Sequence, residues 1–298
     1  MAPEAKHDQL KPVQELLESG VVPEMYLQQL KDEHQVGDGP LPLMDGPIID
    51  FSLLSSFNSE ELSKLRSALS TWGCFQLVNH GMTSELLDEI RELSKEFFKL
   101  PLEEKEKTTL HEYSNKTKEV SKTLFKAMSR SLKLDENRFF ELWGDDKEDI
   151  IHARFNFYPR CPSANQVVGL KAHTDGSAIT VLLQDKEIEG LQVLKDDQWF
   201  KVPIIPEAII IHVGDQLEIA SNGIFKSPVH KVVINPKCDR ISLAMLPLPN
   251  PEKEIGPLKE LITEDRPQMF KRLKDYGQIY FTYMASMERQ INAVKINY

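Results

Sequence analysis

The chain of 298 residues is long enough for one large domain or two small ones, and 41% hydrophobic and 28% charged residues are ordinary for a globular protein. Its formal net charge of −10 argues against nucleic acid as the main partner, because phosphate binding needs a basic face. Three cysteines without a CxxC pair, a polar N-terminus and no long apolar run predict a cytoplasmic protein with neither signal peptide nor membrane span.

The first half of the chain is dominated by helical periodicity. Residues 1–45 are polar and are expected along the surface of the domain. Apolar side chains at three- and four-residue spacing predict helices over 59–71, 84–98 and 114–133. Thr83 or Ser84 is a suitable N-cap for the second helix. Two short strands are expected at 48–51 and 75–78.

The pattern changes near residue 150, where short apolar segments alternate with Gly, Pro, Asn and Asp. Strands are predicted at 153–158, 178–184, 191–194, 199–202, 208–213, 216–219, 229–234 and 240–246. Their number and length fit a double-sheet jelly roll, and a closing helix is expected over 264–286. The predicted class is α+β, a jelly-roll (double-stranded β-helix) core flanked by N-terminal helices and a C-terminal helix. A helical region, 1–150, and the core, 151–298, are expected to form one compact unit.

An HxD pair and a later histidine form the first chemical signal, His173, Asp175 and His230. Residues two apart on a strand face the same side, so His173 and Asp175 can reach one ion while Thr174 points away. Taken alone, the HxD sequence could be an ordinary surface pair, and the later histidine could be structural. Together, two imidazoles and one carboxylate leave an open face, which suits Fe(II) better than structural zinc.

Arg240 and Ser242 form the second signal, ten residues after His230. A guanidinium beside a hydroxyl matches a carboxylate, because the planar group donates two parallel hydrogen bonds. A surface ion pair is the alternative for an isolated RxS. With the histidines, the pattern indicates a non-haem Fe(II) oxygenase that uses 2-oxoglutarate.

These motifs lie in an order that closely resembles the plant 2-oxoglutarate/Fe(II)-dependent dioxygenases of specialised metabolism, along most of the chain. The likeness is strongest to the branch with norcoclaurine-synthase-like and morphinan O-demethylating proteins. The matching segments are Ile48-Ile49-Asp50, 70–81 (STWGCFQLVNHG), 156–162 (NFYPRCP), 173–175 (HTD), 190–193 (GLQV), 213–215 (VGD), 230–232 (HKV) and 240–242 (RIS).

The resemblance implies a role for each of the polar residues. It assigns iron to His173, Asp175 and His230. It assigns the distal carboxylate of 2-oxoglutarate to Arg240, Ser242 and Tyr158, and it places Asn156 near the keto-acid end. For Tyr158, a place in the core is the alternative. Fe(II), 2-oxoglutarate and O2 are the implied cofactors, with ascorbate supportive.

The implied reaction releases succinate and CO2 and hydroxylates or O-demethylates a small, largely apolar plant metabolite. Expected pocket walls, each of which also suits a core position, are Phe157, Leu246, Phe125 and Met128. The enzyme is expected to be a monomer. The sequence leaves open the substrate, the position attacked and the choice between the two oxidations.

Three departures from the family pattern are present, and the first two concern the substrate pocket. Relatives carry a longer segment between the LEEKEK stretch and the helix near Tyr113, so the short region near residues 105–113 implies a more open site, altered specificity or impaired activity. Leu246 replaces a common phenylalanine, and His212 replaces a common asparagine. A catalytically impaired relative, an oxidase of the same fold without 2-oxoglutarate and a non-enzymatic β-sandwich module remain alternatives.

Overall fold

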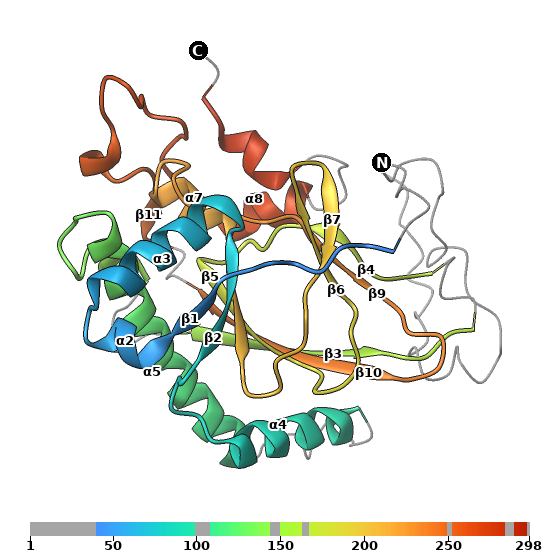
Figure 1. The fold of residues 1–298 in the computed structure, drawn as a ribbon. Helices are drawn as coiled ribbons and strands as arrows, with labels where there is room; N and C mark the ends of the chain where they lie inside the picture. Colours follow the sequence, from blue (N-terminus) through green and yellow to red (C-terminus); the bar gives the residue numbers. More distant parts are fainter. Residues whose placement is uncertain are drawn as a thin grey trace, which may run out of the picture.

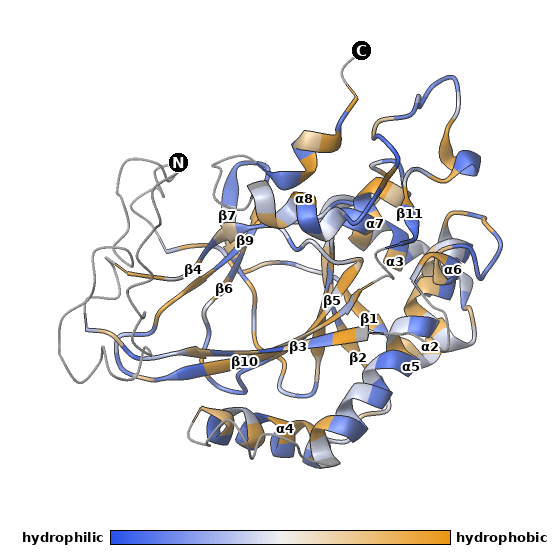
Figure 2. Cartoon of the chain, turned by 180° about the vertical axis from the view of Figure 1, so that it is seen from behind, coloured by the Kyte–Doolittle hydropathy of each residue, from blue (hydrophilic) through white to orange (hydrophobic). Residues whose placement is uncertain are grey.

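The computed structural model describes residues 40–98, 108–143, 150–162, 167–248, 252–283 and 289–296. Two antiparallel-rich sheets form a jelly-roll core, and the fold is of the predicted α+β class (Figure 1). Helices α4 and α5 lie beneath strands β3 and β10, whereas α8 lies on the opposite side in both views (Figures 1 and 2). None of the helices in the described ranges combines the length and apolar character that a membrane crossing requires.

The larger sheet has six strands in the order β1-β2-β8-β5-β10-β3. Its strands are β1 (Ile48–Asp50), β2 (Cys74–Val78), β8 (Ile209–Val213), β5 (Ile179–Gln184), β10 (Arg240–Leu248) and β3 (Ile150–Tyr158). All neighbours pair antiparallel except β1 and β2. The β10–β3 register sets Arg240 opposite Tyr158 and Ser242 opposite Asn156.

The smaller sheet has four antiparallel strands in the order β4-β9-β6-β7. They are β4 (Val168–His173), β9 (His230–Val233), β6 (Leu191–Lys195) and β7 (Gln198–Lys201). A separate pair is formed by β11 (Glu254–Ile255) and β12 (Leu273–Lys274).

Side-chain caps define where the N-terminal helices begin. The Asn58 side chain accepts hydrogen bonds from the amides of Glu60 and Glu61, each at 3.0 Å, and Thr83 accepts one from Leu86 at 3.2 Å. The helices are α2 (Phe51–Ser55), α3 (Ser59–Thr71), α4 (Ser84–Phe97), α5 (Thr108–Ser131), α6 (Phe140–Trp143), α7 (Asp215–Ala220) and α8 (Tyr276–Tyr283), with 3-10 turns at Lys259–Leu261 and Gln290–Val294. Helix α4 alternates hydrophilic and hydrophobic residues along its length (Figure 2).

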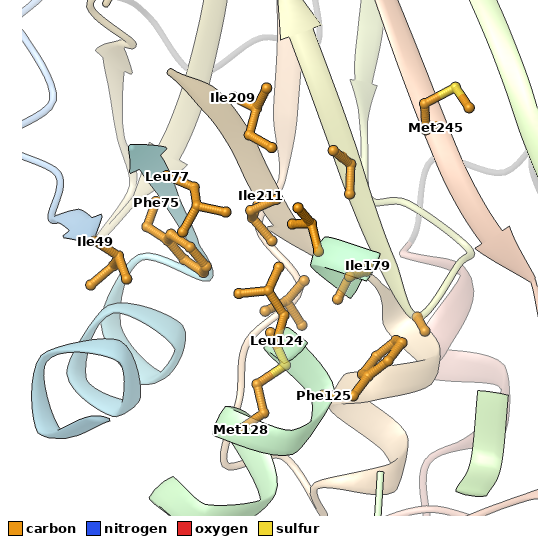
Figure 3. Packing of buried hydrophobic residues seen from close by; sticks show 14 of the residues in the cluster. Ile49, Phe75, Leu77, Leu124, Phe125, Met128, Ile179, Ile209, Ile211 and Met245 are labelled. Carbon is orange, nitrogen blue, oxygen red and sulfur yellow. The ribbon is translucent and has the colours of Figure 1, made fainter. Parts of the chain in front are cut away.

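Alternation along the strands separates two apolar clusters. On β10, Leu243 and Met245 pack in the larger cluster with α3, α4 and α5, whereas Ala244 points to the smaller cluster between the sheets. Figure 3 shows Leu124 and other residues of α5 packed toward the strands of the larger sheet. The even-numbered positions of β3 and β10 therefore line the interior between the two sheets.

The predicted helices at 59–71 and 84–98 and all but one of the predicted strands are confirmed, with small shifts of their ends. The strand predicted at 216–219 is wrong: these residues belong to helix α7, which starts after Gly214. Four residues that alternate polar and apolar fit either state, and in the structure the amides of Leu217 and Glu218 donate to the Gly214 carbonyl as the first turn of the helix. Strand β4 was missing from the predicted set. The predictions for residues 1–39 and for LEEKEK lie outside the described residues.

The closing helix predicted over 264–286 is too long at its N-terminal end. Within the described residues only Tyr276–Tyr283 is helical, as α8. Pro267 and the left-handed backbone of Asp275, with φ at 49°, interrupt a continuous helix before it. Helix α5, by contrast, extends the predicted 114–133 segment toward its N-terminus.

Candidate active site

Two histidines of the smaller sheet and an aspartate from the loop after β4 converge on one point. His173 ends β4 and His230 begins β9, and the two are cross-strand partners with ring centroids 4.3 Å apart. Asp175 follows in the loop after β4, not on the strand itself as the HxD spacing had suggested. A ligand atom from each of the three lies within 4.8 Å of the others. These three residues are called the triad below.

The backbone fixes which nitrogen each triad histidine presents. His173 Nδ1 lies 2.8 Å from the carbonyl of Lys171, and His230 Nδ1 lies 3.1 Å from that of Pro228. A carbonyl only accepts, so both Nδ1 atoms carry the proton and both Nε2 lone pairs are exposed toward the centre. Asp175 Oδ1 lies 3.6 Å from His173 Nε2 and 3.7 Å from His230 Nε2.

The electrostatics favour a charged aspartate and neutral histidines. Burial lowers the pKa of His230 to about 3, with the neighbouring imidazoles adding to the shift, and burial also lowers the pKa of His173. Burial alone would raise the pKa of Asp175, but the imidazoles of His230, His212 and His173 outweigh it and hold that pKa well below its usual range. These protonation states are the ones that bind a divalent metal.

The loop that carries Asp175 is tied to the C-terminal part of the chain. Thr174 turns its hydroxyl away from the triad to Asp215 Oδ2 at 3.1 Å, and the Tyr276 hydroxyl donates to the same oxygen at 2.8 Å. The Tyr280 hydroxyl donates to the Thr174 carbonyl at 2.8 Å. Burial raises the pKa of Asp215 to about 6. This network fixes the triad loop against helix α8.

Arg240 is the largest side chain among those fully buried in the described residues, at 1% exposure. Its Nε donates to the Ile188 carbonyl at 3.1 Å, but neither Nη has a hydrogen-bond partner within the described ranges. Gly190 leaves room for it, because a Cβ there would lie 3.0 Å from Arg240 Cδ. A buried cation with two unpaired amino groups calls for an anionic ligand.

The other predicted co-substrate residues surround this guanidinium. Arg240 Cζ lies 5.3 Å from the ring centroid of Tyr158, a contact over the ring face, and burial raises the pKa of that tyrosine. Asn156 Nδ2 donates to Ser242 Oγ at 3.3 Å. All four residues occupy interior positions of β3 and β10.

The residues of the site therefore fit Fe(II) and 2-oxoglutarate, the two groups that the sequence motifs imply. The triad offers two imidazole nitrogens and a carboxylate oxygen, the donor set of an open Fe(II) site. The two Nη atoms of Arg240, which have no partner in the described ranges, offer with Ser242 a planar match for one carboxylate of a dicarboxylic acid.

Comparisons with known proteins give the family. Residues 148–246 match the 2OG-Fe(II) oxygenase superfamily, and residues 47–161 match the non-haem dioxygenase in morphine synthesis N-terminal family. Protein SRG1 of Arabidopsis thaliana is 32% identical over 92% of both chains. Codeine O-demethylase of Papaver somniferum is 34% identical over 76% of this chain and 78% of its own. The chain belongs to the plant 2-oxoglutarate/Fe(II)-dependent dioxygenases.

The structural comparison agrees with this membership. A crystal structure of JOX2 in complex with 2OG, Fe and JA superposes with a TM-score of 0.83 at 27% identity, covering 97% of this chain and 98% of that one. The dioxygenase is accordingly an oxidoreductase that uses Fe(II), 2-oxoglutarate and O2.

The expected pocket residues of the dioxygenase separate into two groups. Leu246 packs on the interior cluster between the sheets. Phe125 and Met128 are not brought to the triad: both lie in the core between α5 and the outer face of the larger sheet, where Phe125 stacks on Trp143 (Figure 3). Phe157 also points outward, toward Phe98. Helical spacing predicted that Phe125 and Met128 are buried, but it could not predict whether they face the interior between the two sheets or the outer face of the larger sheet.

Several interior polar residues of the dioxygenase were not predicted as part of the site. Thr180 and Gln184 lie on the inner face of β5, and the Thr180 hydroxyl donates to Asp175 Oδ2 at 2.6 Å. His212, noted in the sequence only as a departure, lies on β8 beside the triad. Polar residues at alternate positions of the apolar strand ITVLLQ were a signal that could have identified the first two.

Proposed function

We propose that His173, Asp175 and His230 bind the catalytic Fe(II) and leave its opposite face to 2-oxoglutarate and O2. The observation that carries the proposal is the fully buried guanidinium of Arg240, whose two Nη atoms have no hydrogen-bond partner among the described residues, in the same interior as the triad. Arg240, Ser242 and Tyr158 bind the distal carboxylate of 2-oxoglutarate, and Asn156 stands near its keto-acid end.

The iron, when bound, supplies the activation of O2 that is coupled to oxidative decarboxylation of 2-oxoglutarate to succinate and CO2. The protein sets the geometry. Arg240 orients the co-substrate with two parallel donors before O2 arrives. Thr180 fixes Asp175 Oδ2, so that Oδ1 faces the two histidine Nε2 atoms.

We propose that the substrate is a small, largely apolar plant metabolite, which is hydroxylated or O-demethylated. Two kinds of support exist. Relatives between 31% and 34% identical include codeine O-demethylase and flavonol synthases. Apolar side chains on the interior faces of β5 and β10 provide a lining that suits such a molecule, namely Leu182, Ala244 and Leu246.

The test has a binding step and a turnover step. Anaerobic addition of Fe(II) and then 2-oxoglutarate should give a visible metal-to-ligand charge-transfer band, and Asp175→Ala should give none. A panel of alkaloids, phenolics and terpenoids should then contain a compound that triggers succinate release. Absence of the band contradicts the proposed site. A band without turnover across the panel indicates an impaired relative, and turnover without succinate indicates an oxidase that does not use 2-oxoglutarate.

We further propose a monomeric, cytoplasmic enzyme whose two regions, 1–150 and 151–298, act as one unit. The three cysteines are unpaired, as expected in a reducing compartment. One apolar cluster contains Leu69, Leu87 and Leu124 from the helices together with Ile211 and Leu243 from the larger sheet. A single cooperative unfolding transition and a monomer mass in solution are the expected results.

A further inference from the structure

His212 is a third histidine at the triad, on β8 of the larger sheet. Its side chain is 1% exposed, and its Nδ1 lies 3.6 Å from Asp175 Oδ2. Its ring centroid lies 4.5 Å from that of His230, with the rings edge to face. The metal-binding cluster of His173, Asp175 and His230 does not include it. His212 therefore contacts the triad at the Asp175 carboxylate and at the ring of His230.

The two oxygens of Asp175 have different neighbours. Oδ1 faces the Nε2 atoms of His173 and His230. Oδ2 accepts the Thr180 hydroxyl at 2.6 Å and is the carboxylate oxygen nearest to His212. One hydrogen bond leaves a carboxylate able to turn about its Cβ–Cγ bond. A second polar contact to Oδ2 from another direction restricts that rotation.

The two side chains next to Asp175 Oδ2, Thr180 and His212, both come from the larger sheet. Thr180 and His212 are cross-strand partners on β5 and β8, so their side chains project from neighbouring backbone positions. Neither ring nitrogen of His212 has a hydrogen-bond partner among the described residues, and at 3.6 Å the contact with Oδ2 is close but not a full hydrogen bond. A buried imidazole N–H needs an acceptor, and Oδ2 is the carboxylate oxygen that it faces.

We propose that His212 is a positioning residue for the metal-binding carboxylate. With Thr180 it forms a two-point support for Asp175 Oδ2 and keeps Oδ1 directed toward the histidine Nε2 atoms. The proposal rests on Asp175 being a metal ligand. Groups that orient a ligating carboxylate commonly change metal affinity 10- to 100-fold when removed.

The experiment measures Co(II) binding to the full-length apo-protein by isothermal titration calorimetry, without 2-oxoglutarate or turnover. His212→Phe keeps a ring against His230 but has no nitrogen, and we expect it to weaken Co(II) binding by about tenfold. His212→Asn keeps an N–H donor and should bind within about threefold of wild type, on the same scale. Ile210→Val, at a buried interior position of the same strand, is the matched control and should bind like wild type.

Far-UV circular dichroism checks that each variant is folded, and His212→Leu replaces His212→Phe if the larger ring is not accommodated. Wild-type Co(II) affinity in the variant without a nitrogen overturns the proposal. Equal losses in the Asn and Phe variants also overturn it, because they indicate packing instead of hydrogen bonding. Asp175→Ala separates failure of the metal site from failure of the His212 role. If Asp175→Ala binds Co(II) like wild type, the proposed metal site is wrong. If Asp175→Ala binds weakly while His212→Phe binds like wild type, only the role of His212 is rejected.

Discussion

Arg240→Met separates what this arginine does for binding from what it does for folding. The substitution replaces an arginine that is 1% exposed with an unbranched apolar side chain that ends near the position of Nε. It removes one charge-assisted hydrogen bond, Nε to the Ile188 carbonyl, which contributes about 1.5–3 kcal/mol. It also removes a buried cation whose two Nη atoms have no hydrogen-bond partner in the part of the chain that the structure describes, and desolvating such an ion costs several kcal/mol. The free energy of unfolding of the apo-protein should therefore equal or exceed that of wild type.

The same change should abolish stabilisation by the co-substrate. A ligand at 100 times its Kd stabilises a folded protein by about 2.7 kcal/mol. Two charge-assisted hydrogen bonds contribute about 1.5 kcal/mol each or more, so losing them raises the Kd for 2-oxoglutarate roughly 100-fold. At the same concentration, the stabilisation then falls to about 0.4 kcal/mol.

Urea unfolding with Mn(II), with and without 2-oxoglutarate, measures both effects. Arg138→Met is the matched control, because it removes an arginine from a surface pair with Glu260 and should leave the co-substrate effect intact. Arg240→Lys keeps the charge without the planar fork and should mainly raise the 2-oxoglutarate requirement. An Arg240→Met protein that loses more than about 2 kcal/mol yet is still stabilised by 2-oxoglutarate would refute the reasoning, because the unpaired cation would then serve the fold.

Three further predictions concern the triad and its support. Asp175→Ala should abolish turnover while circular dichroism stays native, and normal turnover contradicts the ligand role. Burial lowers the pKa of His230 to about 3, so between pH 7 and 5 the unfolded chain gains a proton that the folded chain does not. His230 alone should cost the apo-protein about 2 kcal/mol over this range, so a His230→Gln variant that loses as much as wild type in urea titrations argues against this assignment. Tyr276→Phe leaves buried Asp215 without its 2.8 Å donor and should lower the free energy of unfolding by about 1–3 kcal/mol; an unchanged urea midpoint contradicts this.

Local sequence patterns were sufficient to predict helices whose apolar spacing and N-cap residue are both visible in the sequence. Helix α4 follows from its apolar spacing and from Thr83, since periodicity and capping depend only on neighbours in the chain. The same reasoning failed at 216–219, where four residues fit a strand and a helix equally well. Gly214, the N-cap of α7, donates its amide to the Ala178 carbonyl at 2.8 Å, a contact between distant parts of the chain that local sequence does not show.

The substrate pocket shows the same limit. Spacing identified Phe125 and Met128 as buried, but burial between a helix and a sheet resembles burial between two sheets when only the sequence is read. On β10 the two kinds of burial can be told apart, because successive side chains of a strand point to opposite faces of the sheet. Leu246 lies on the interior side and Met245 on the helical side.

The sequence by itself determined the donor types: the ligand atoms offered by His173, Asp175 and His230, and the guanidinium and hydroxyl of Arg240 and Ser242 that we propose bind a carboxylate, follow from residue identity and order. Only the tertiary structure decided how they meet. The two histidines come from the smaller sheet, Asp175 from the loop after β4 and Arg240 from the larger sheet. The physical reason is that the burial that lowers the pKa of His230 and encloses Arg240 depends on strands far apart in the chain, and folding alone brings these together.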